Sequence, residues 1–335
     1  MNKKPTIRDI AEICGCSANT VSRVLRGSTR ISLALREKIA RVAKEIGYIP
    51  NSLAESMRTG STKTIAVIFQ DFRNPFFAVL ARFIEEYARS LGYFVLFATT
   101  SESAEQEVAA CRTVLGRNVD GILFSPIQRD TKAVKLLMGQ KTPFVLLGRR
   151  FQGVDAYSVI ADDEQGAYLT TRHLLERGAR EILFLNSFSF ICTSQFREQG
   201  YLRALKEYGG QPHILEVSME YGKTREALKR LYQKPQPYDA ILTFCDMMGF
   251  EAYYTLREIG RRVPGDILLA GMDGMQRDFI YPISLTSAVI DRKVLAEKAM
   301  DMLLMLIEHQ RDSGKPLPDK KEIVIPQTLF LGQTT

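Results

Sequence analysis

From Ile65 onward, the chain alternates between short runs of Val, Ile, Leu and Phe and longer segments whose apolar residues recur at helical spacing. Uninterrupted apolar runs are typical of strands buried on both faces, and such strands form parallel sheets covered by helices. The expected strands are residues 65–69, 93–98, 121–124 and 144–147, with helices at 76–91, 105–115 and 132–138. The pattern predicts an α/β unit with a doubly wound parallel sheet.

The same alternation then starts again, which predicts a second lobe folded like the first. Its strands are expected at residues 181–185, 214–217, 240–244 and 267–270, and its helices at 195–208, 224–232 and 248–259. The last segments are expected to weave back: residues 286–290 cross between the lobes, 293–308 form a helix on the first lobe, and 323–325 form a strand. Two lobes joined by such crossovers leave a cleft between them.

The charge of the chain is concentrated near its N-terminus. The net charge is +7 over 335 residues. Residues 1–62 hold 11 Lys and Arg against 5 Asp and Glu, a difference of +6, whereas the remaining residues hold 34 against 33. This distribution is expected of a small nucleic-acid-binding head on a neutral body. The alternative is a solvated basic tail, but apolar residues at helical spacing inside this segment argue against it.

Residues 17–26 predict a short helix with Ser17 as its N-cap. Asn19 and Arg23 lie four residues apart and therefore share one helix face. An exposed Asn and Arg at a helix N-terminus suit a DNA groove, because Arg bonds guanine, Asn bonds adenine and an Ala methyl contacts the thymine methyl. A small amphipathic surface helix is the alternative. The expected buried side is Val21, Val24 and Leu25, and the outward side is Ala18, Asn19 and Arg23.

The neighbouring segments favour a DNA-binding arrangement. Thr6 can cap a preceding helix with Ile7, Ile10, Ala11 and Cys14 at spacing i, i+3, i+4, i+7. Gly15-Cys16 predicts a tight turn into Ser17, and Ser32 is expected to cap a third helix. A helix, a short Gly-containing turn and a second helix form the helix-turn-helix arrangement, whose second helix enters the major groove.

Three ordered segments resemble the lactose-repressor (LacI/GalR) family of bacterial regulators: Thr6-Ile-Arg-Asp-Ile-Ala11, Cys16-Ser17 with Thr20-Val-Ser-Arg-Val24, and Gly47-Tyr48-Ile-Pro-Asn51. The resemblance implies a head at residues 1–49, a hinge helix at 50–61 and an effector-binding, dimerising core at 62–335. It also implies that the core shares the fold of periplasmic sugar-binding proteins, with lobe 1 at about 62–161 plus 292–325 and lobe 2 at about 162–291 plus the C-terminal tail.

The resemblance also implies which residues contact DNA. In the family, the hinge helix pairs with that of a second subunit in the minor groove, and a leucine wedges between base pairs. Met57 stands at the matching position, and Met is one of the apolar side chains that can serve as a wedge. A plain linker is the alternative. The expected DNA-binding residues are Thr6, Ser17, Ala18, Asn19, Thr20, Ser22, Arg23, Arg30, Asn51, Ala54, Met57 and Arg58.

In open α/β sheets, ligands bind outside the carboxyl ends of the strands. This rule and the resemblance together give an expected set of effector-binding residues. Alternatives remain for several of them: the aromatic residues can pack a helix, Arg149 can form a structural salt bridge, and the acids can cap helices. The expected set is Asp71, Phe76, Phe77, Arg149, Asp162, Phe190, Thr193, Arg197, Asp246 and Asp273.

The sequence departs from the family pattern at several places. Asp163 replaces the more usual Asn, and the ending 329–333 differs from the common Arg-Glu-Ser-like tail. The loop 186–194 is apolar where several relatives are polar, because it carries Phe188, Phe190 and Ile191. If these residues line the cleft, the effector is less polar than a simple sugar, or larger. No C-terminal leucine heptad occurs, so a coiled-coil tetramer is not expected.

Little in the sequence favours an enzyme. Neither G-x-G-x-x-G nor G-x-x-x-x-G-K-[ST] occurs, and His173, His213 and His309 lie far apart. The five cysteines are scattered, so neither a disulfide framework nor a metal site is expected. No run approaches the ~20 apolar residues of a membrane span, and no signal segment begins the chain, so the cytoplasm, with the nucleoid, is the expected location.

Three function classes are compatible with these features to different degrees. A doubly wound enzyme with an unrelated basic arm lacks a catalytic constellation, and a transport-type binding protein lacks a signal peptide and would not need a DNA-binding head. The leading prediction is a sequence-specific transcriptional regulator, expected to repress, that acts as a homodimer on double-stranded operator DNA. A small-molecule effector, most simply a sugar, is expected between the lobes, and no cofactor, metal or catalytic residue is expected.

Overall fold

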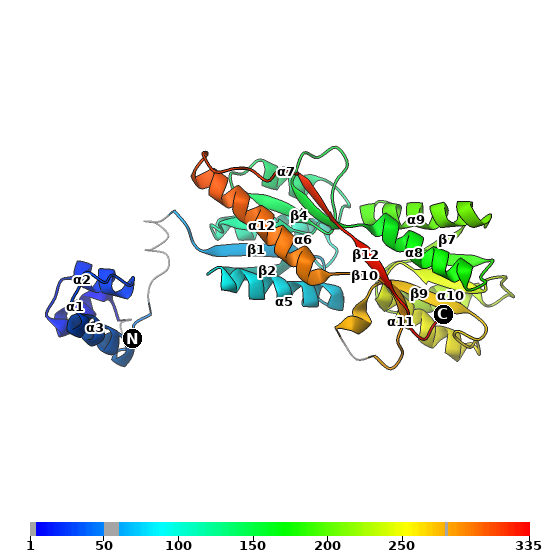
Figure 1. Cartoon of the computed structure of the whole chain (residues 1–335), viewed down its shortest axis with the longest axis horizontal. Coiled ribbons are helices and arrows are strands. Elements are labelled where there is room, and N and C mark those ends of the chain that lie inside the picture. The colour runs from blue at the N-terminus through cyan, green and yellow to red at the C-terminus, as the bar shows by residue number, and fades with distance from the viewer. Residues whose placement is uncertain (1–4, 50–59, 279–280) are drawn as a thin grey trace. The chain divides into compact units, whose positions relative to one another are not determined.

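A computed structural model describes residues 5–49, 60–278 and 281–335 (Figure 1). The chain divides into two compact units, Met1–Thr62 and Lys63–Thr335. Four of the expected DNA-binding residues, Asn51, Ala54, Met57 and Arg58, lie outside the described residues, as does the rest of the expected hinge helix at 50–59.

The described part of the first unit contains α1 (Ile7–Cys14), α2 (Ala18–Leu25) and α3 (Leu33–Glu45). Thr6 caps α1 through a capping box, because its hydroxyl accepts from the Asp9 amide while the Asp9 carboxylate accepts from the Thr6 amide. The Ser17 hydroxyl caps α2 by accepting from the Thr20 amide at 3.1 Å. Both caps were predicted. The predicted Ser32 cap is wrong in part: Ser32 precedes α3, but its side chain makes no capping hydrogen bond.

A small apolar core holds these helices together. Ile10, Val21 and Ile39, one from each helix, are fully buried. Gly15 has a φ of +68° at the end of α1, a conformation that Gly adopts without steric cost, and so turns the chain sharply toward α2. Helix, turn and helix therefore follow in the predicted order, with α3 completing the core.

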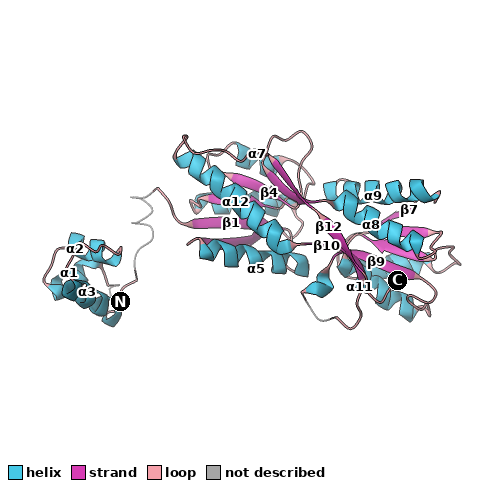
Figure 2. Ribbon diagram, viewed as in Figure 1, coloured by secondary structure: helices cyan, strands magenta, loops and turns pink. Residues whose placement is uncertain are grey.

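The second unit contains two separate sheets (Figure 2). The first sheet has the strand order β11-β5-β4-β3-β1-β2, and all of its pairings are parallel. Apolar cores lie on both faces, with α5 and α12 on one and α6 and α7 on the other. The elements are β1 (Thr64–Phe69), α5 (Pro75–Ser90), β2 (Phe94–Thr99), α6 (Ala104–Gly116), β3 (Gly121–Phe124), α7 (Lys132–Met138), β4 (Phe144–Leu147), β5 (Ser158–Ala161), α12 (Arg292–Arg311) and β11 (Glu322–Ile325).

The second sheet has the order β12-β10-β9-β8-β6-β7. α8 and α9 cover one face, and α10 and α11 cover the other. The elements are α8 (Asp163–Glu176), β6 (Ile182–Asn186), α9 (Cys192–Tyr208), β7 (His213–Glu216), α10 (Lys223–Leu231), β8 (Ala240–Thr243), α11 (Asp246–Glu258), β9 (Leu268–Asp273), the 3-10 helix η1 (Met275–Arg277), β10 (Thr286–Ile290) and β12 (Gln327–Phe330).

The predicted fold class is confirmed, and the predicted elements agree with the observed ones to within three residues at each end. The second sheet is not wholly parallel, because β12 pairs with β10 in the antiparallel sense. Residues 286–290, expected to cross between the lobes, belong instead to the second sheet as β10, and the crossing follows at Asp291. The predicted set did not include β5 or β12, and it placed a helix at His173 without giving the bounds of α8.

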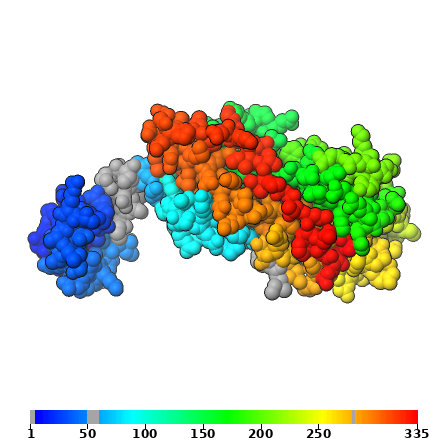
Figure 3. All heavy atoms as spheres, viewed as in Figure 1, coloured from blue at the N-terminus to red at the C-terminus, as the bar shows by residue number. Residues whose placement is uncertain are grey.

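The chain passes between the two sheets three times in the described residues: from β5 to α8, from β10 to α12, and from β11 to β12. Figure 3 shows the last of these segments in red, running along the surface from one lobe to the other. These crossings bring the carboxyl ends of strands from both lobes to the same region. No helix in the described part of the chain is both long enough and apolar enough to cross a membrane.

Candidate functional site

The outward face of α2 carries two free polar side chains. Asn19 and Arg23 are exposed, and within the described residues no hydrogen bond or ion pair occupies either side chain. Ala18 was expected to share this face, but it is half-buried and packs against the core of the head. The reason is that Ala18 begins the apolar stripe that continues through Val21 and Leu25 at spacing i, i+3, i+7.

The other expected DNA-binding residues of the head differ in how free their side chains are. The hydroxyls of Ser17 and Thr20 lie 2.9 Å apart and bond each other. The Thr6 hydroxyl donates to Asp9 at 2.7 Å, so its described role is that of a cap. Ser22 is half-buried, and Arg30 is exposed in the loop that follows α2.

A cavity lies between the two lobes of the second unit, and loops after strands of both sheets line it. The crossing segments contribute Ile290, Leu295 and Gln327 to its wall. The structure brings together eight of the ten residues expected to contact an effector. These are Asp71, Phe76, Phe77, Arg149, Phe190, Thr193, Arg197 and Asp273.

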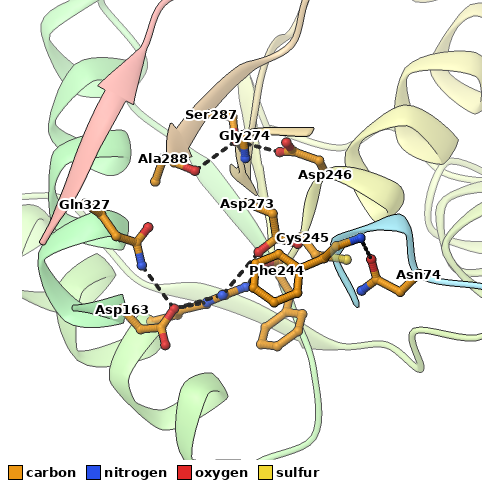
Figure 4. A network of polar contacts seen from close by, with 12 residues as sticks. Asn74, Asp163, Phe244, Cys245, Asp246, Asp273, Gly274, Ser287, Ala288 and Gln327 are labelled. Carbon is orange, nitrogen blue, oxygen red and sulfur yellow. Dashed lines mark hydrogen bonds and ion pairs between the residues drawn. The ribbon is translucent and has the colours of Figure 1, made fainter. Parts of the chain in front are cut away.

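Arg197 is the centre of a buried polar network on the second lobe. Figure 4 shows Asp163, Phe244, Asp273 and Gln327 of this network. Its Nε and Nη2 both lie 2.8 Å from Asp163 Oδ1, and Nη2 lies 3.4 Å from Asp273 Oδ1. Its Nη1 donates to the carbonyl of Phe244, and the guanidinium stacks 4.4 Å from the Phe244 ring centroid. Gln327 donates to Asp163 at 3.3 Å. This network fixes the direction of the Arg197 and Asp273 side chains at the cavity wall.

Two carboxyl groups share this one guanidinium. Burial raises the pKa of Asp163, and Arg197 opposes that shift. Burial also raises the pKa of Asp273 to about 6, against the influence of Arg197 and Arg292. Asp273 has a φ of +115°, in a region that favours glycine, so its backbone is strained. Such strain persists where neighbouring contacts over-determine a conformation, which occurs often at ligand sites.

The first lobe presents three further guanidinium groups to the cavity, those of Arg73, Arg129 and Arg149. Arg149 is only 7% exposed and donates from Nη1 to the Pro126 carbonyl at 3.1 Å. Burial lowers the pKa of the Arg149 guanidinium; Glu102 opposes this shift and Arg197 adds to it. Arg129 is exposed and lies 5.2 Å from the ring centroid of Phe190.

Aromatic rings form much of the remaining wall. Phe188 and Phe190 stack with centroids 5.5 Å apart, and both line the cavity, so the apolar loop does face the cleft as the sequence suggested. Phe76 and Phe77 pack edge to face at 5.4 Å and contact the core of the first lobe while also lining the cavity. Aromatic faces beside fixed polar groups suit ligands with both apolar and hydroxyl-bearing surfaces.

Two acids of the expected set lie away from the cavity wall. Asp162 caps α8 by accepting from the Gln165 amide at 3.0 Å. Asp246, fully buried, accepts from the Ser287 hydroxyl and from the Met275 amide, both at 2.7 Å. Its carboxylate therefore holds together the segment after β9, and it is not among the residues that line the cavity.

The cavity also contains polar residues outside the expected set. Asp163 replaces Asp162 at the wall, one position along the chain, and the departure from Asn had already marked it. Glu102 and Arg129 follow β2 and β3, so the strand-end rule, applied to every strand, would have found them. Gln327 had no sequence signal, because β12 was not expected. The described ranges contain no group of three or more side chains arranged to hold a metal ion.

Two family models match the chain. Residues 6–51 match a model described as bacterial regulatory proteins, lacI family, and residues 62–323 match one described as periplasmic binding proteins and sugar binding domain of LacI family. Together they cover the head and both lobes.

Two relatives align with this chain over nearly its full length. The ribose operon repressor of Haemophilus influenzae is 27% identical, with 97% of this chain and 98% of that protein aligned. The transcriptional regulator GalR of Escherichia coli K12 is also 27% identical, over 96% of this chain and 93% of that protein.

Two solved structures show the same architecture. A lac repressor dimer bound to operator and the anti-inducer ONPF aligns with a TM-score of 0.87 at 25% identity, covering 99% of each chain. A complex of the transcriptional regulator CelR with cellobiose aligns with a TM-score of 0.72 at 26% identity, covering 99% of this chain and 100% of the other. Members of this family regulate transcription and are not enzymes. The chain belongs to the lacI family of bacterial regulatory proteins, as a DNA-binding transcriptional regulator with an effector-binding domain of two lobes.

Proposed function

We propose that this protein represses transcription as a homodimer on a pseudo-palindromic operator, and that a sugar-like effector bound between its lobes controls the affinity for that operator. The observation that carries the proposal is the Arg197 network, which holds a guanidinium and two carboxyl groups at the wall of an interlobe cavity beside aromatic rings. Sugar hydroxyls can bond these polar groups while the C–H face of the sugar ring packs on Phe76 or Phe190.

The comparisons support this proposal by the ligands that their structures contain. One solved relative is bound to cellobiose, and another is a dimer bound to operator and a small-molecule anti-inducer. In the head, Asn19 and Arg23 present free polar groups that suit base edges in the major groove. The proposed DNA-binding set keeps Ser17, Thr20, Ser22 and Arg30 as further contacts, and Met57 as the wedge in the minor groove.

Regulation follows from the position of the cavity. A ligand that contacts residues of both lobes binds one interlobe angle more tightly than another, and this difference in affinity is the free energy available for coupling. Since each lobe is a rigid sheet with helices on both faces, a change at the cavity moves whole lobes. The proposed consequence is a change in the spacing or order of the DNA-binding segments of the dimer.

The test begins with selection of bound sequences from random duplex DNA by the full-length protein. The expected result is a pseudo-palindrome whose half-sites lie about one helical turn apart, with a flexible pyrimidine–purine step at its centre. The selected duplex is then titrated with and without a panel of sugars. An operator affinity that stays constant at saturating concentrations of every sugar that binds would refute effector control.

A further inference from the structure

The cations that line the cavity fall into two classes. Arg73 pairs with Asp71 at 2.5 Å, and Arg197 pairs with Asp163 at 2.8 Å. Arg129 and Arg149 differ, because neither forms an ion pair within the described residues. Both belong to the first lobe, and both follow strands whose carboxyl ends face the cavity.

Arg149 is the more informative of these two groups. A guanidinium has five N–H donors, and within the described ranges the one hydrogen bond of the Arg149 side chain uses Nη1 alone. The side chain is more than nine-tenths buried. Even so, those of its nitrogens that make no hydrogen bond are not fully enclosed by protein atoms. Its remaining donors therefore open into the cavity that it lines. Burying a cation without an anion is costly, so this position favours an anionic partner.

The opposite wall of the cavity carries the N-terminus of a helix. α9 begins there, Thr193 in its first turn lines the cavity, and the N-cap residue Ile191 supplies no side-chain cap. The N-terminal end of a 17-residue helix carries partial positive charge. Arg197, also on α9, is already paired with Asp163 and Asp273. The helix end is therefore the positive contribution of this wall to an anion bound at Arg149.

Five carboxyl groups line the same cavity. Asp71 pairs with Arg73, and Asp163 and Asp273 pair with Arg197, whereas Glu102 and Glu220 form no ion pair in the part of the chain that the structure describes. Glu102 is close enough to Arg149 and Arg129 for their charges to interact. Burial raises the pKa of Glu102 in spite of both arginines. A ligand that displaces water from the cavity adds to this burial, so Glu102 is better suited to bond a hydroxyl than to neutralise a cation.

We infer that the effector is an anionic sugar, larger than a simple sugar by a carboxylate or phosphate group. That group binds Arg149 and Arg129, while the sugar hydroxyls lie toward Arg197 and Asp273 and the apolar face of the ring packs on Phe190. The inference rests on the proposed function, since it names the ligand class of the same cavity. A guanidinium recognises carboxylate and phosphate alike through paired N–H donors, so the geometry supports the charge and leaves the two anions to be distinguished by experiment.

The test is calorimetric titration of the full-length protein with matched sets of sugars. Each set contains a neutral sugar, its uronic acid and its 6-phosphate, for glucose and for galactose, and cellobiose serves as a neutral disaccharide. At least one anionic member is expected to bind about 10- to 100-fold more tightly than its neutral parent, the factor that a charged hydrogen bond supplies. The preference for an anionic sugar over its neutral parent should diminish in high salt. Whether the uronic acid or the 6-phosphate binds more tightly shows which anion the site recognises.

Variants separate this inference from general ligand binding. Arg149→Gln should weaken binding of the anionic sugar much more than binding of its neutral parent, and Arg149→Lys should restore part of the difference. The matched control is Arg150→Gln, because Arg150 pairs with Glu322 at 3.0 Å and does not line the cavity. All variants must unfold at the same denaturant midpoint as the unaltered protein, which shows that the effector-binding unit still folds.

The outcomes are distinguishable. A neutral sugar that binds as tightly as its acid and phosphate, and that still shifts operator affinity, overturns the anionic class and leaves the proposed function standing. Loss of anion preference in Arg150→Gln equal to that in Arg149→Gln also overturns the inference. If no sugar of either class binds or shifts operator affinity, both the inference and the proposed effector control fail.

Discussion

Asp273 shows how one residue can combine strain, burial and charge at a ligand site. Its φ of +115° is held by contacts on both sides: Arg292 donates to its carbonyl, and Arg197 lies 3.4 Å from its carboxylate. The neighbouring Gly274 amide donates to Ser287 at 3.0 Å. These contacts aim the carboxylate at the cavity, and they explain why a residue with a Cβ tolerates a conformation that glycine would adopt more easily.

The pH dependence of effector binding follows from the same residue. Burial raises the pKa of Asp273 from 3.8 to about 6. Binding through the carboxylate needs the ionised form, so affinity should be about tenfold weaker at pH 5 than at pH 7. Asp273→Asn should bind more weakly but with a flatter profile between these pH values. Calorimetric titration at several pH values measures this, and an unchanged slope in the variant would exclude Asp273 as the titrating group.

The effect of the same carboxyl on stability has the opposite sign. Between pH 3.8 and about 6, the folded protein holds a proton on Asp273 that the unfolded chain has released. Folding is therefore favoured by this group at acid pH, and that contribution is lost as the pH rises through the folded pKa. Ligand affinity and stability thus respond to Asp273 in opposite directions, which separates a binding effect from partial unfolding.

Base recognition by the head is also a question for single residues. Asn19→Ala or Arg23→Ala should each weaken binding to the selected duplex by ~1–3 kcal/mol and relax the preference at one base position. Both side chains are exposed and are not part of the apolar core, so neither change should unfold the head. The check is repeated sequence selection with each variant. A preference identical to that of the unaltered protein would exclude direct readout at that residue.

For single residues, the sequence predicted the position in the fold better than the direction in which the side chain points. The strand-end rule placed both Asp246 and Asp273 at the correct edge of the second sheet. It could not show that Asp246, the first residue of α11, turns toward Ser287 and Met275, whereas Asp273 faces the cavity. That difference depends on β10, a strand distant in the sequence, and local spacing carries no information about such a partner.

Among the elements, α8 and α9 are packed closely through Gly200. A Cβ at this position would collide with the carbonyl oxygen of Glu164 and would lie 2.8 Å from the amide nitrogen of Tyr168. Gly200→Ala should therefore separate the helices and lower the free energy of unfolding by about 1–3 kcal/mol, as overpacking does. Gly116→Ala is the control, since Gly116 ends α6 with no atom within 4 Å of its Cβ position. Denaturant unfolding that shows equal losses would contradict this account.

Helix α12 begins with a residue that ties the two lobes together. Arg292 donates to the carbonyls of Asp273 and Gly274 and pairs with Asp278, although α12 itself packs on the first lobe. Arg292→Gln should weaken effector binding about tenfold although Arg292 does not line the cavity. The reason is that the strained segment at Asp273 loses the hydrogen bonds that hold its carbonyl groups. The measurement is the effector dissociation constant together with the pH profile, and a profile unchanged from that of the unaltered protein would argue against a role through Asp273.

The elements that sequence reasoning missed share a physical cause. β12 begins with Gln327 and Thr328, so it lacks a continuous apolar run. β5 is as long as β3 and β4, but residues 148–157 before it form no helix, so it falls outside the alternation of strands and helices. α8 begins with Asp163 and Glu164 and buries Gly166, Thr170 and Thr171, which weakens its apolar stripe. These elements lie where the chain crosses between lobes, and there burial comes from packing between distant segments rather than from local hydrophobicity.

At the scale of the whole molecule, charge and burial divide the chain in the same place. The excess positive charge lies in residues 1–62, and the compact units meet between Thr62 and Lys63. Each unit has an apolar core of its own. The sequence predicted this division because composition and periodicity are properties of long segments, which average over the local errors that affect single strands.

The division predicts that the two activities can be separated. A variant that lacks residues 1–61 should bind the effector with unchanged affinity, because every residue that lines the cavity lies between Asp71 and Gln327. It should bind neither the selected duplex nor non-specific DNA at moderate salt, since it loses a net charge of +6 as well as α2. Calorimetric titration and duplex binding measure the two properties. Retained DNA affinity would mean that the neutral core contacts DNA, and lost effector affinity would mean that the head helps to shape the cavity.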